Sequence, residues 1–217
     1  MKIFIDFDDV LFNTKEFIAD LKKVFYKNGI SKKMYTESYE AHPNINSSGK
    51  LSKYDVYDHI NILEEKFKID VTNLRQDIDN VIAELSRYVF PDVPEFIGRF
   101  EKKDIHIISF GETKLQTDKI DNSGLKNKVK STLIIYELKS SGVNKIIQKY
   151  KINTEEEMYF IDDRIEQISD VKKKFPQIKT VLVGRKEGRY RDRKNKYCDY
   201  KISQLKELEK IIKIHGE

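Results

Sequence analysis

The sequence predicts an α/β fold, with a doubly wound parallel sheet as its core and a smaller helical domain inserted into it. Short apolar runs alternate along the chain with amphipathic segments of helical spacing, a pattern typical of parallel strands joined by helices. One connection is far longer than the others. The first apolar run ends near residue 6 and the next begins near residue 104, whereas a strand–helix–strand crossover needs much less chain.

The composition limits the class of protein. The 217 residues suffice for one large domain, or for a core with a small second domain. Hydrophobic residues make up 39% of the chain and charged residues 35%, which suits a soluble globular protein. No apolar stretch approaches the ~20 residues of a membrane-spanning helix, and the N-terminal apolar run is too short for a signal peptide. The one cysteine, Cys198, excludes an internal disulfide, so we expect a cytoplasmic protein with no membrane partner.

The core is predicted to contain five strands. Each is a run rich in β-branched and aromatic residues, as expected of strands buried on both faces, and the runs cover residues 2–6, 104–109, 132–136, 157–162 and 179–183. Amphipathic patterns of helical spacing lie between and after these strands, at residues 113–122, 139–150, 165–175 and 203–214.

The long connection predicts a helical cap domain. We assign residues 14–92 to this cap domain and residues 1–13 and 93–217 to the core. Ligands of open α/β sheets bind at the carboxyl ends of the strands. An insert that leaves the first strand at that end is therefore expected to cover the site as a lid.

Three helices are predicted within the cap domain. Apolar residues recur at helical spacing over residues 15–27 and 53–67. Thr72 is expected to cap a third helix. The polar stretch from residue 35 to residue 50 is interpreted as a surface loop, and its His42 is a candidate contact for a substrate.

Candidate catalytic residues follow the first two core strands. Asp6 and Asp8 come directly after the first strand, where two carboxylates spaced i and i+2 can point into one crevice. Aspartate is also common in turns that cap helices, which is the alternative reading of this pair. At the end of the second strand, Ser109 can donate a hydrogen bond to a phosphoryl oxygen, with help from backbone N–H groups of Phe110 and Gly111.

A lysine is expected near the start of the helix that follows the third strand. Lys139 is the candidate, because an ammonium group there can neutralise charge on both a carboxylate nucleophile and a phosphoryl group. Lys145 and Lys149 lie nearby in the sequence and stay open as alternatives.

Two adjacent acids, Asp162 and Asp163, close the fourth strand. Carboxylates at the end of a buried apolar strand are costly unless they bind a cation or accept several hydrogen bonds. Mg²⁺ prefers oxygen ligands from one or two carboxylates, waters and a substrate phosphate. Asp6, Asp8 and one of Asp162 and Asp163 would make such a site.

This set of motifs resembles the haloacid dehalogenase-like hydrolase superfamily, which has a Rossmann-like core. Residues 6–11 match the family pattern Asp-x-Asp-x-Thr/Val-Leu, with Asp9 at a position often held by glycine. Ser109, Lys139 and the pair Asp162–Asp163 match its second, third and fourth motifs. The resemblance covers the core and implies, for residues 14–92, only that a cap is present at the first insertion point.

One position departs from the pattern of many family members. They carry another acid four residues after the position of Asp163, whereas this chain has Gln167 there. The departure is similar to variants of the family in which the fourth motif is Asp-Asp, and it leaves a smaller role for Glu166 open.

The resemblance implies a Mg²⁺-dependent phosphatase. Asp6 would attack phosphorus and form an aspartyl-phosphate, while Asp8 would protonate the leaving oxygen and later activate water. The metal would be held by Asp6, by Asp8 through its backbone carbonyl, and by Asp163 or Asp162. Dehalogenase members lack an acid two residues after the nucleophile, so Asp8 favours phosphoryl transfer.

The substrate class stays open between several readings. Closure of a helical cap favours a small phosphorylated metabolite or a nucleotide. The basic segment 185–196 and the net charge of +5 leave room for a phosphatase acting on nucleic-acid ends. A non-catalytic phospho-acceptor of the receiver type would need an aspartate after the third strand, where the sequence has Tyr136-Glu137-Leu138. A member of the same family that only binds a partner is the further alternative, although the core catalytic positions are all filled. The oligomeric state is not indicated.

Overall fold

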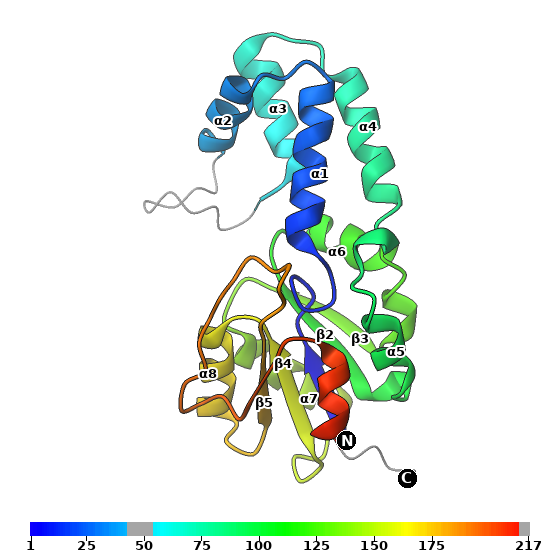
Figure 1. Cartoon of the computed structure of the whole chain (residues 1–217), viewed down its shortest axis with the longest axis vertical. Coiled ribbons are helices and arrows are strands. Elements are labelled where there is room, and N and C mark those ends of the chain that lie inside the picture. The colour runs from blue at the N-terminus through cyan, green and yellow to red at the C-terminus, as the bar shows by residue number, and fades with distance from the viewer. Residues whose placement is uncertain (43–53, 213–217) are drawn as a thin grey trace.

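The computed structural model describes residues 1–42 and 54–212 of the chain. Within these residues, parallel strands form one sheet in the order β3-β2-β1-β4-β5-β6 (Figure 1). The strands are β1 (Lys2–Ile5), β2 (Ile105–Phe110), β3 (Ser131–Ile135), β4 (Met158–Asp162), β5 (Lys179–Val183) and β6 (Tyr200–Ile202). From β1 the chain moves to β2 and β3 on one side and then to β4, β5 and β6 on the other. This reversal confirms the predicted doubly wound, Rossmann-like sheet.

The predicted strands are all present, with ends that differ by no more than one residue from those expected. The edge strand β6 was not predicted, because three residues are too few for an apolar pattern to show. The helix predicted near residues 203–214 is instead a short 3₁₀ helix, η4 (Leu205–Lys210), and its last predicted residues lie outside the described part of the chain. Leu205 and Leu208 are both fully buried, and the three-residue repeat of a 3₁₀ helix places them on one face.

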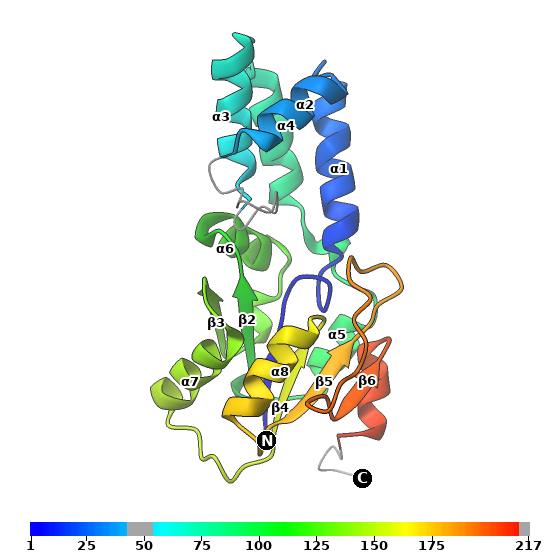
Figure 2. The same cartoon turned by 90° about the vertical axis from the view of Figure 1, so that its left-hand side faces the viewer.

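Apolar layers cover both faces of the sheet. Helices α7 (Lys139–Tyr150) and α8 (Ile165–Lys174) cover one face, and α5 (Val93–Gly98) and α6 (Thr113–Asn122) lie on the other (Figure 2). Successive residues of a strand point to opposite faces. Accordingly, Phe4 packs in the cluster with α7 and α8, whereas its neighbours Ile3 and Ile5 pack in the opposite cluster.

Four helices stand beyond the carboxyl ends of the strands, as Figure 1 shows. They are α1 (Thr14–Lys27), α2 (Lys32–Glu40), α3 (Val56–Phe67) and α4 (Thr72–Ala83). Helices α1, α3 and α4 correspond to the three predicted helices. None of the helices in the described residues combines the length and apolar character that crossing a membrane requires. The division into a core and a cap domain at residues 14–92 stays a prediction.

Helix α2 corrects the interpretation of residues 35–50 as a loop, which is wrong for residues 35–40. The N–H of Met34 donates to the Ser31 side chain at 3.2 Å and so caps the helix. Ser38 is buried and its Oγ lies 2.7 Å from Nε2 of His59 in α3. The buried face of α2 is therefore made of tyrosine and serine rather than aliphatic residues, which is why no apolar period marked it. Residues 43–50 lie outside the described residues.

The start of α4 also differs from the expected cap. Thr72 is its first residue, and the preceding Val71 provides no side-chain hydrogen bond. The carboxylate of Asp70 accepts from the Thr72 N–H at 2.8 Å and from the Thr72 hydroxyl at 2.6 Å. Asp70 therefore satisfies the free N–H group of the first residue of α4.

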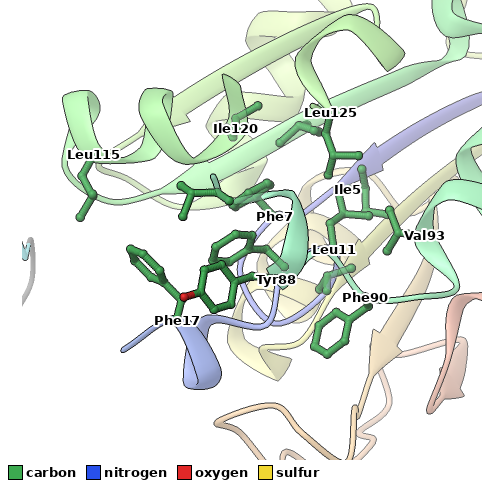
Figure 3. Packing of buried hydrophobic residues seen from close by; sticks show 14 of the residues in the cluster. Ile5, Phe7, Leu11, Phe17, Tyr88, Phe90, Val93, Leu115, Ile120 and Leu125 are labelled. Atoms are coloured by element: carbon green, nitrogen blue, oxygen red, sulfur yellow. The ribbon is translucent and has the colours of Figure 1, made fainter. Parts of the chain in front are cut away.

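The loop after β1 is packed tightly where the core meets α1. The rings of Phe7 and Phe12 stack with centroids 5.0 Å apart, and Phe17 of α1 and Tyr88 pack against Phe12. Figure 3 shows Phe7, Phe17 and Tyr88 in one cluster with Leu11, and this cluster continues to residues of α5 and α6. Core and helical insert thus share a continuous apolar interior, which holds the loop in place.

The basic segment 185–196 binds groups of the protein itself. Nε of the buried Arg185 donates to the main-chain oxygen of Val10 at 2.8 Å, and its Nη1 lies 2.9 Å from Oδ1 of Asp92. The Arg185 guanidinium also lies 3.9 Å from the ring centroid of Phe90. Arg191 donates to main-chain oxygens within the same segment. Part of the segment's charge is therefore used to tie it to the core.

Replacement of Arg185 is expected to destabilise the fold. Arg185→Met leaves the partly buried Asp92 without its cation, a change that costs about 3–5 kcal/mol when a buried pair is broken. Arg193→Met removes the same charge from an exposed position of the same segment and should alter stability by no more than about 0.5 kcal/mol. Urea unfolding followed by circular dichroism measures both; equal effects would contradict the structural role of Arg185.

Candidate active site

A cleft of about 220 Å³ lies at the carboxyl ends of β1, β2 and β4. Every described residue that lines it belongs to the predicted core, and none belongs to α1–α4. The lining residues are Asp6, Asp8, Phe110, Lys139, Asp162, Asp163, Arg164, Glu166, Gln167, Arg189 and Tyr190. Candidates from all four predicted strand ends therefore reach one cleft.

Lys139 is the lysine that reaches Asp6. Its Nζ lies 2.5 Å from Oδ1 of Asp6 and also donates to the main-chain oxygen of Ile108, and both charged side chains are buried. Lys145 forms an ion pair at the surface, and Lys149 is exposed. The fold thus brings Lys139, and neither alternative, to the predicted nucleophile.

Side chains from α8 hold the start of α7, where Lys139 is the first residue. Oε1 of Gln167 accepts from the Lys139 N–H at 3.0 Å, and Oδ2 of Asp170 accepts from the Ser140 N–H at 2.8 Å. These contacts satisfy N–H groups that no residue preceding α7 caps. Gln167, which stands where many family members carry an acid, therefore positions the lysine.

Three buried carboxyl groups form an acidic cluster around this lysine. Asp6, Asp162 and Asp163 each offer an oxygen, and these oxygens lie within 4.8 Å of one another. Oδ2 of Asp162 and Oδ2 of Asp163 are buried and have no hydrogen-bond partner among the described residues. Oxygen donors of this kind, left without hydrogen bonds in a buried site, suit a hard divalent cation.

The pKa shifts of these three carboxyl groups also favour a bound divalent cation. Burial raises the pKa of Asp6, against the opposing effect of the Lys139 ammonium group. Burial and the charge of Asp6 raise the pKa of Asp162 to about 7. Burial and the charges of Asp162 and Asp6 raise the pKa of Asp163 to about 10. Three carboxyl groups share one ammonium group, and a divalent cation would neutralise the remaining negative charge.

Asp8 lies apart from the acidic cluster and is bound by other groups. Its Oδ1 accepts from Nζ of Lys119 and, at 2.6 Å, from the hydroxyl of Thr14, and its Oδ2 accepts from Nε2 of Gln116 at 2.7 Å. Burial alone would raise the pKa of Asp8, but the positive charges of Lys119 and Arg189 outweigh it and lower that pKa. Its carboxylate is therefore held as an anion, whereas its backbone carbonyl stays the predicted metal ligand.

Lys119 is the residue that the sequence analysis missed at this position. It lies on α6 with its ammonium group 5.4, 5.1 and 5.8 Å from the ring centroids of Phe7, Phe12 and Phe17. Its side chain is only 4% exposed. A usable signal was present, because Lys119 follows Leu115 by four residues and so falls on the apolar face of its helix.

The residues at the end of β2 take different places. The hydroxyl of Ser109 is buried without a hydrogen-bond partner among the described residues, and Phe110 is 40% exposed at the cleft. Gly111 has a φ of +149°, and a Cβ there would lie 2.6 Å from Nε2 of Gln116. Glycine at this position therefore leaves room for the side chain that binds Asp8; a substrate contact of Gly111 stays a prediction.

Two further candidates occupy settings that the sequence did not indicate. Glu166 lines the cleft but pairs with Arg164. His42 is not on a surface loop as expected, because it is only 2% exposed, with Nε2 4.0 Å from Oδ2 of Asp58 and its ring 6.0 Å from that of Tyr54. A buried histidine at the end of α2 is not available to a substrate in this arrangement.

Solved structures with this architecture come from several bacteria. A protein from Burkholderia xenovorans, described as a haloacid dehalogenase-like hydrolase, aligns with a TM-score of 0.71 at 18% identity over 96% of this chain and 94% of its own. The hydrolase YfnB from Bacillus subtilis, bound to magnesium, has a TM-score of 0.63 at 16% identity over 97% of both chains. L-2-haloacid dehalogenase from Xanthobacter autotrophicus, with chloropropionic acid covalently bound, has a TM-score of 0.61 at 12% identity over 99% of both. Identities this low show the shared fold.

Comparison with curated proteins gave no match. The family model for haloacid dehalogenase-like hydrolases matches residues 3–169, which is more than half of the 217 residues. The match includes the carboxyl ends of β1 to β4, where the candidate residues lie. The chain therefore belongs to the haloacid dehalogenase-like hydrolases.

Proposed function

We propose that the protein is a Mg²⁺-dependent phosphatase that hydrolyses a phosphate monoester, a small phosphorylated metabolite or a nucleotide, through an aspartyl-phosphate. The observation that carries the proposal is the buried cluster of Asp6, Asp162 and Asp163 around Lys139. Such a cluster combines a carboxylate nucleophile, oxygen donors for a cation and a fixed positive charge in one cleft.

In this mechanism, a carboxylate oxygen of Asp6 attacks phosphorus, and the bond from phosphorus to the leaving oxygen breaks. Lys139 orients Asp6 and offsets negative charge on the transferred phosphoryl group. Asp6, Asp162 and Asp163 would hold Mg²⁺, which, when bound, lets an anionic nucleophile approach an anionic phosphate. Ser109, whose hydroxyl has no described partner, would donate to a phosphoryl oxygen. Water then attacks the phosphorus of the aspartyl-phosphate and restores Asp6.

Asp8 would move protons in both halves of the reaction. Its contacts with Lys119, Gln116 and Thr14 favour the ionised carboxylate. That form suits the second half, in which a general base removes a proton from the attacking water. Protonation of the leaving oxygen in the first half requires Asp8 to bind a proton against these contacts. Substrates with poor leaving groups are therefore expected to depend most on Asp8.

Dehalogenation is the second candidate, favoured by the likeness to L-2-haloacid dehalogenase. Asp8 argues against it, because the family resemblance associates an acid at this position with phosphoryl transfer. A nucleic-acid-end phosphatase is less favoured, since Arg185 and Arg191 of the basic segment bind the protein itself. The cleft of about 220 Å³ also lies below the ~300–1,000 Å³ of pockets that enclose drug-sized ligands, which favours a small substrate. The cytoplasmic location stays a prediction.

The wild-type protein is expected to hydrolyse p-nitrophenyl phosphate with Mg²⁺ and to lose this activity in EDTA. Asp6→Asn removes the nucleophile and should lower kcat at least about a thousandfold. Asp8→Asn should slow turnover about 10²–10⁴-fold, with a greater loss on an alkyl phosphate, whose leaving oxygen needs a proton. The rate of phosphate release measures the activity of the wild type and of both variants. The rate of halide release from L-2-chloropropionate tests for dehalogenation. Metal-independent turnover, or activity retained in Asp6→Asn, would contradict the proposal.

Lys139 and Lys145 provide a matched pair for the active-site lysine. Lys139→Met should lower kcat about 10²–10³-fold, because it removes a positive charge that acts on the transferred group. Lys145→Met removes the same charge at the surface and should leave kcat within about twofold. Kinetics of both variants on one aryl phosphate, after circular dichroism has confirmed folding, decide between them. Equal losses would remove Lys139 from the mechanism.

The thermal stability of the protein should depend on pH, and Mg²⁺ should change that dependence. Burial and neighbouring charges raise the pKa of Asp162 to about 7 and that of Asp163 to about 10. The stability that these groups contribute is full below the ordinary carboxyl pKa of about 4 and falls as pH rises from there, until about pH 7 for Asp162 and about pH 10 for Asp163. Without metal, the Tm is expected to fall between pH 7 and pH 9.5, and Mg²⁺ should raise the Tm more at pH 9 than at pH 7 because it binds the ionised groups. Asp163→Asn is the control in which both effects should shrink. A Mg²⁺ effect that is independent of pH and of this substitution would count against metal binding here.

A further inference from the structure

Asp9 occupies a backbone conformation that favours glycine. Its φ is +57°, in the left-handed region, and family members often carry glycine at this position. The Asp9 side chain is only 1% exposed, and Nε of Arg189 donates to its Oδ2 at 2.5 Å. An aspartate in this position is therefore accounted for by its bond to an arginine that lies 180 residues further along the chain.

Arg189 brings a guanidinium group to the cleft from the segment between β5 and β6. Asp9 holds its Nε, and its two terminal nitrogens donate no hydrogen bond to any described residue. The side chain is 33% exposed and lines the same cleft as Asp6. Arg189 is bound to Asp9, the neighbour in sequence of Asp8, and lines the same cleft as Asp8, the proposed proton donor to the leaving oxygen. These contacts favour a place for Arg189 on the leaving-group side of the cleft.

The Tyr190 ring lies near the guanidinium groups of both Arg164 and Arg189. The Tyr190 ring centroid lies 3.9 Å from the guanidinium carbon of Arg164 and 5.3 Å from that of Arg189. Arg164 is paired with Glu166 and with Asp192, whose Oδ2 is 3.7 Å from its Nε. Arg164 is therefore paired with two carboxylates, whereas Arg189 is paired with Asp9 through its Nε and keeps both terminal nitrogens for an added anion.

We propose that Arg189, positioned by Asp9, binds a second anionic group on the leaving-group side of the substrate. The preferred substrates are then short phosphate monoesters that also carry a carboxylate or a second phosphate. The proposal rests on the proposed phosphatase function and extends it to a substrate class. A planar guanidinium with two free N–H donors matches either anion in a bidentate manner. Arg189 and Asp6 line one cleft of about 220 Å³, which favours a second anion close to the reacting phosphate.

A matched three-carbon series tests the proposal on the full chain with Mg²⁺. Propane-1,3-diol monophosphate has a neutral leaving group, 3-phosphooxypropanoate adds a carboxylate, and propane-1,3-diol bisphosphate adds a phosphate. The wild-type kcat/KM is expected to be at least about tenfold higher for one or both anionic members. The comparison of those two members identifies which anion is bound. No preference over the neutral member would overturn the proposal.

Substitutions separate binding by Arg189 from a general structural role. Arg189→Met should abolish the preference by raising KM for the anionic members, and Arg189→Lys should restore part of it, because it returns the charge without the planar donor pair. Asp9→Asn should weaken the preference less than Arg189→Met. Arg193→Met, which removes an exposed charge from the same segment, should keep the wild-type ratio. A ratio that survives Arg189→Met, or falls equally in Arg193→Met, would refute the assignment.

Binding to the Asp6→Asn variant keeps the test independent of turnover. Calorimetry with the same three compounds should show about tenfold tighter binding of an anionic member, and Asp6→Asn combined with Arg189→Met should lose this difference. If the wild type hydrolyses no phosphate at all, the proposed phosphatase function fails, while the binding difference still decides on Arg189. Equal binding of all three compounds would overturn the proposal for Arg189 whether or not phosphates are hydrolysed.

Discussion

The buried ion pair between Asp6 and Lys139 is the constraint on which the rest of the site depends. Removing charges from water is costly, so a buried pair persists only where its geometry and additional hydrogen bonds compensate. Here Lys139 also donates to the main-chain oxygen of Ile108, and Gln167 holds its backbone at the start of α7. Gly142 lets that helix approach the sheet closely, since a Cβ there would lie 2.9 Å from Cγ2 of Ile108. Strands β1 and β2 and helices α7 and α8 thus act together to place one ammonium group.

The helical insert is connected to the chemistry through Asp8 rather than through the lining of the cleft. Thr14, the first residue of α1, donates to Asp8, while Lys119 and Gln116 bind the same carboxylate from α6. The rings that surround Lys119 include Phe17 of α1. A displacement of α1 would therefore disturb a carboxylate of the site even though none of the described cleft residues comes from α1–α4. The role of the insert as a lid stays a prediction.

The basic segment 185–196 shows why clustered charge in a sequence is a weak guide to binding partners. Arg185 ties the segment to Val10 and Asp92, Arg191 satisfies main-chain oxygens, and Arg189 reaches Asp9. These contacts fold a charged stretch back onto the end of the sheet, beside the cleft. Three arginines of the segment thus bind groups of the protein, although most residues of the segment are exposed.

The sequence by itself determined the parallel sheet, the position of the insert and the four strand ends, because local patterns predict each of them. Buried apolar runs predict the strands, helical spacing predicts the insert, and polar residues directly after a strand mark the strand ends. It did not reveal α2, whose buried face is Tyr35 and Ser38, nor β6, which is too short to show a period. Tertiary structure alone decided that Lys139 reaches Asp6 across 133 residues, that Lys119 reaches Asp8 across 111, and that Arg189 reaches Asp9 across 180. The physical reason is that the sequence gives no local pattern that distinguishes a buried lysine or arginine from an exposed one, and the chain contains 41 of them. Only the path of the folded backbone selects which of these charges is buried beside a carboxylate.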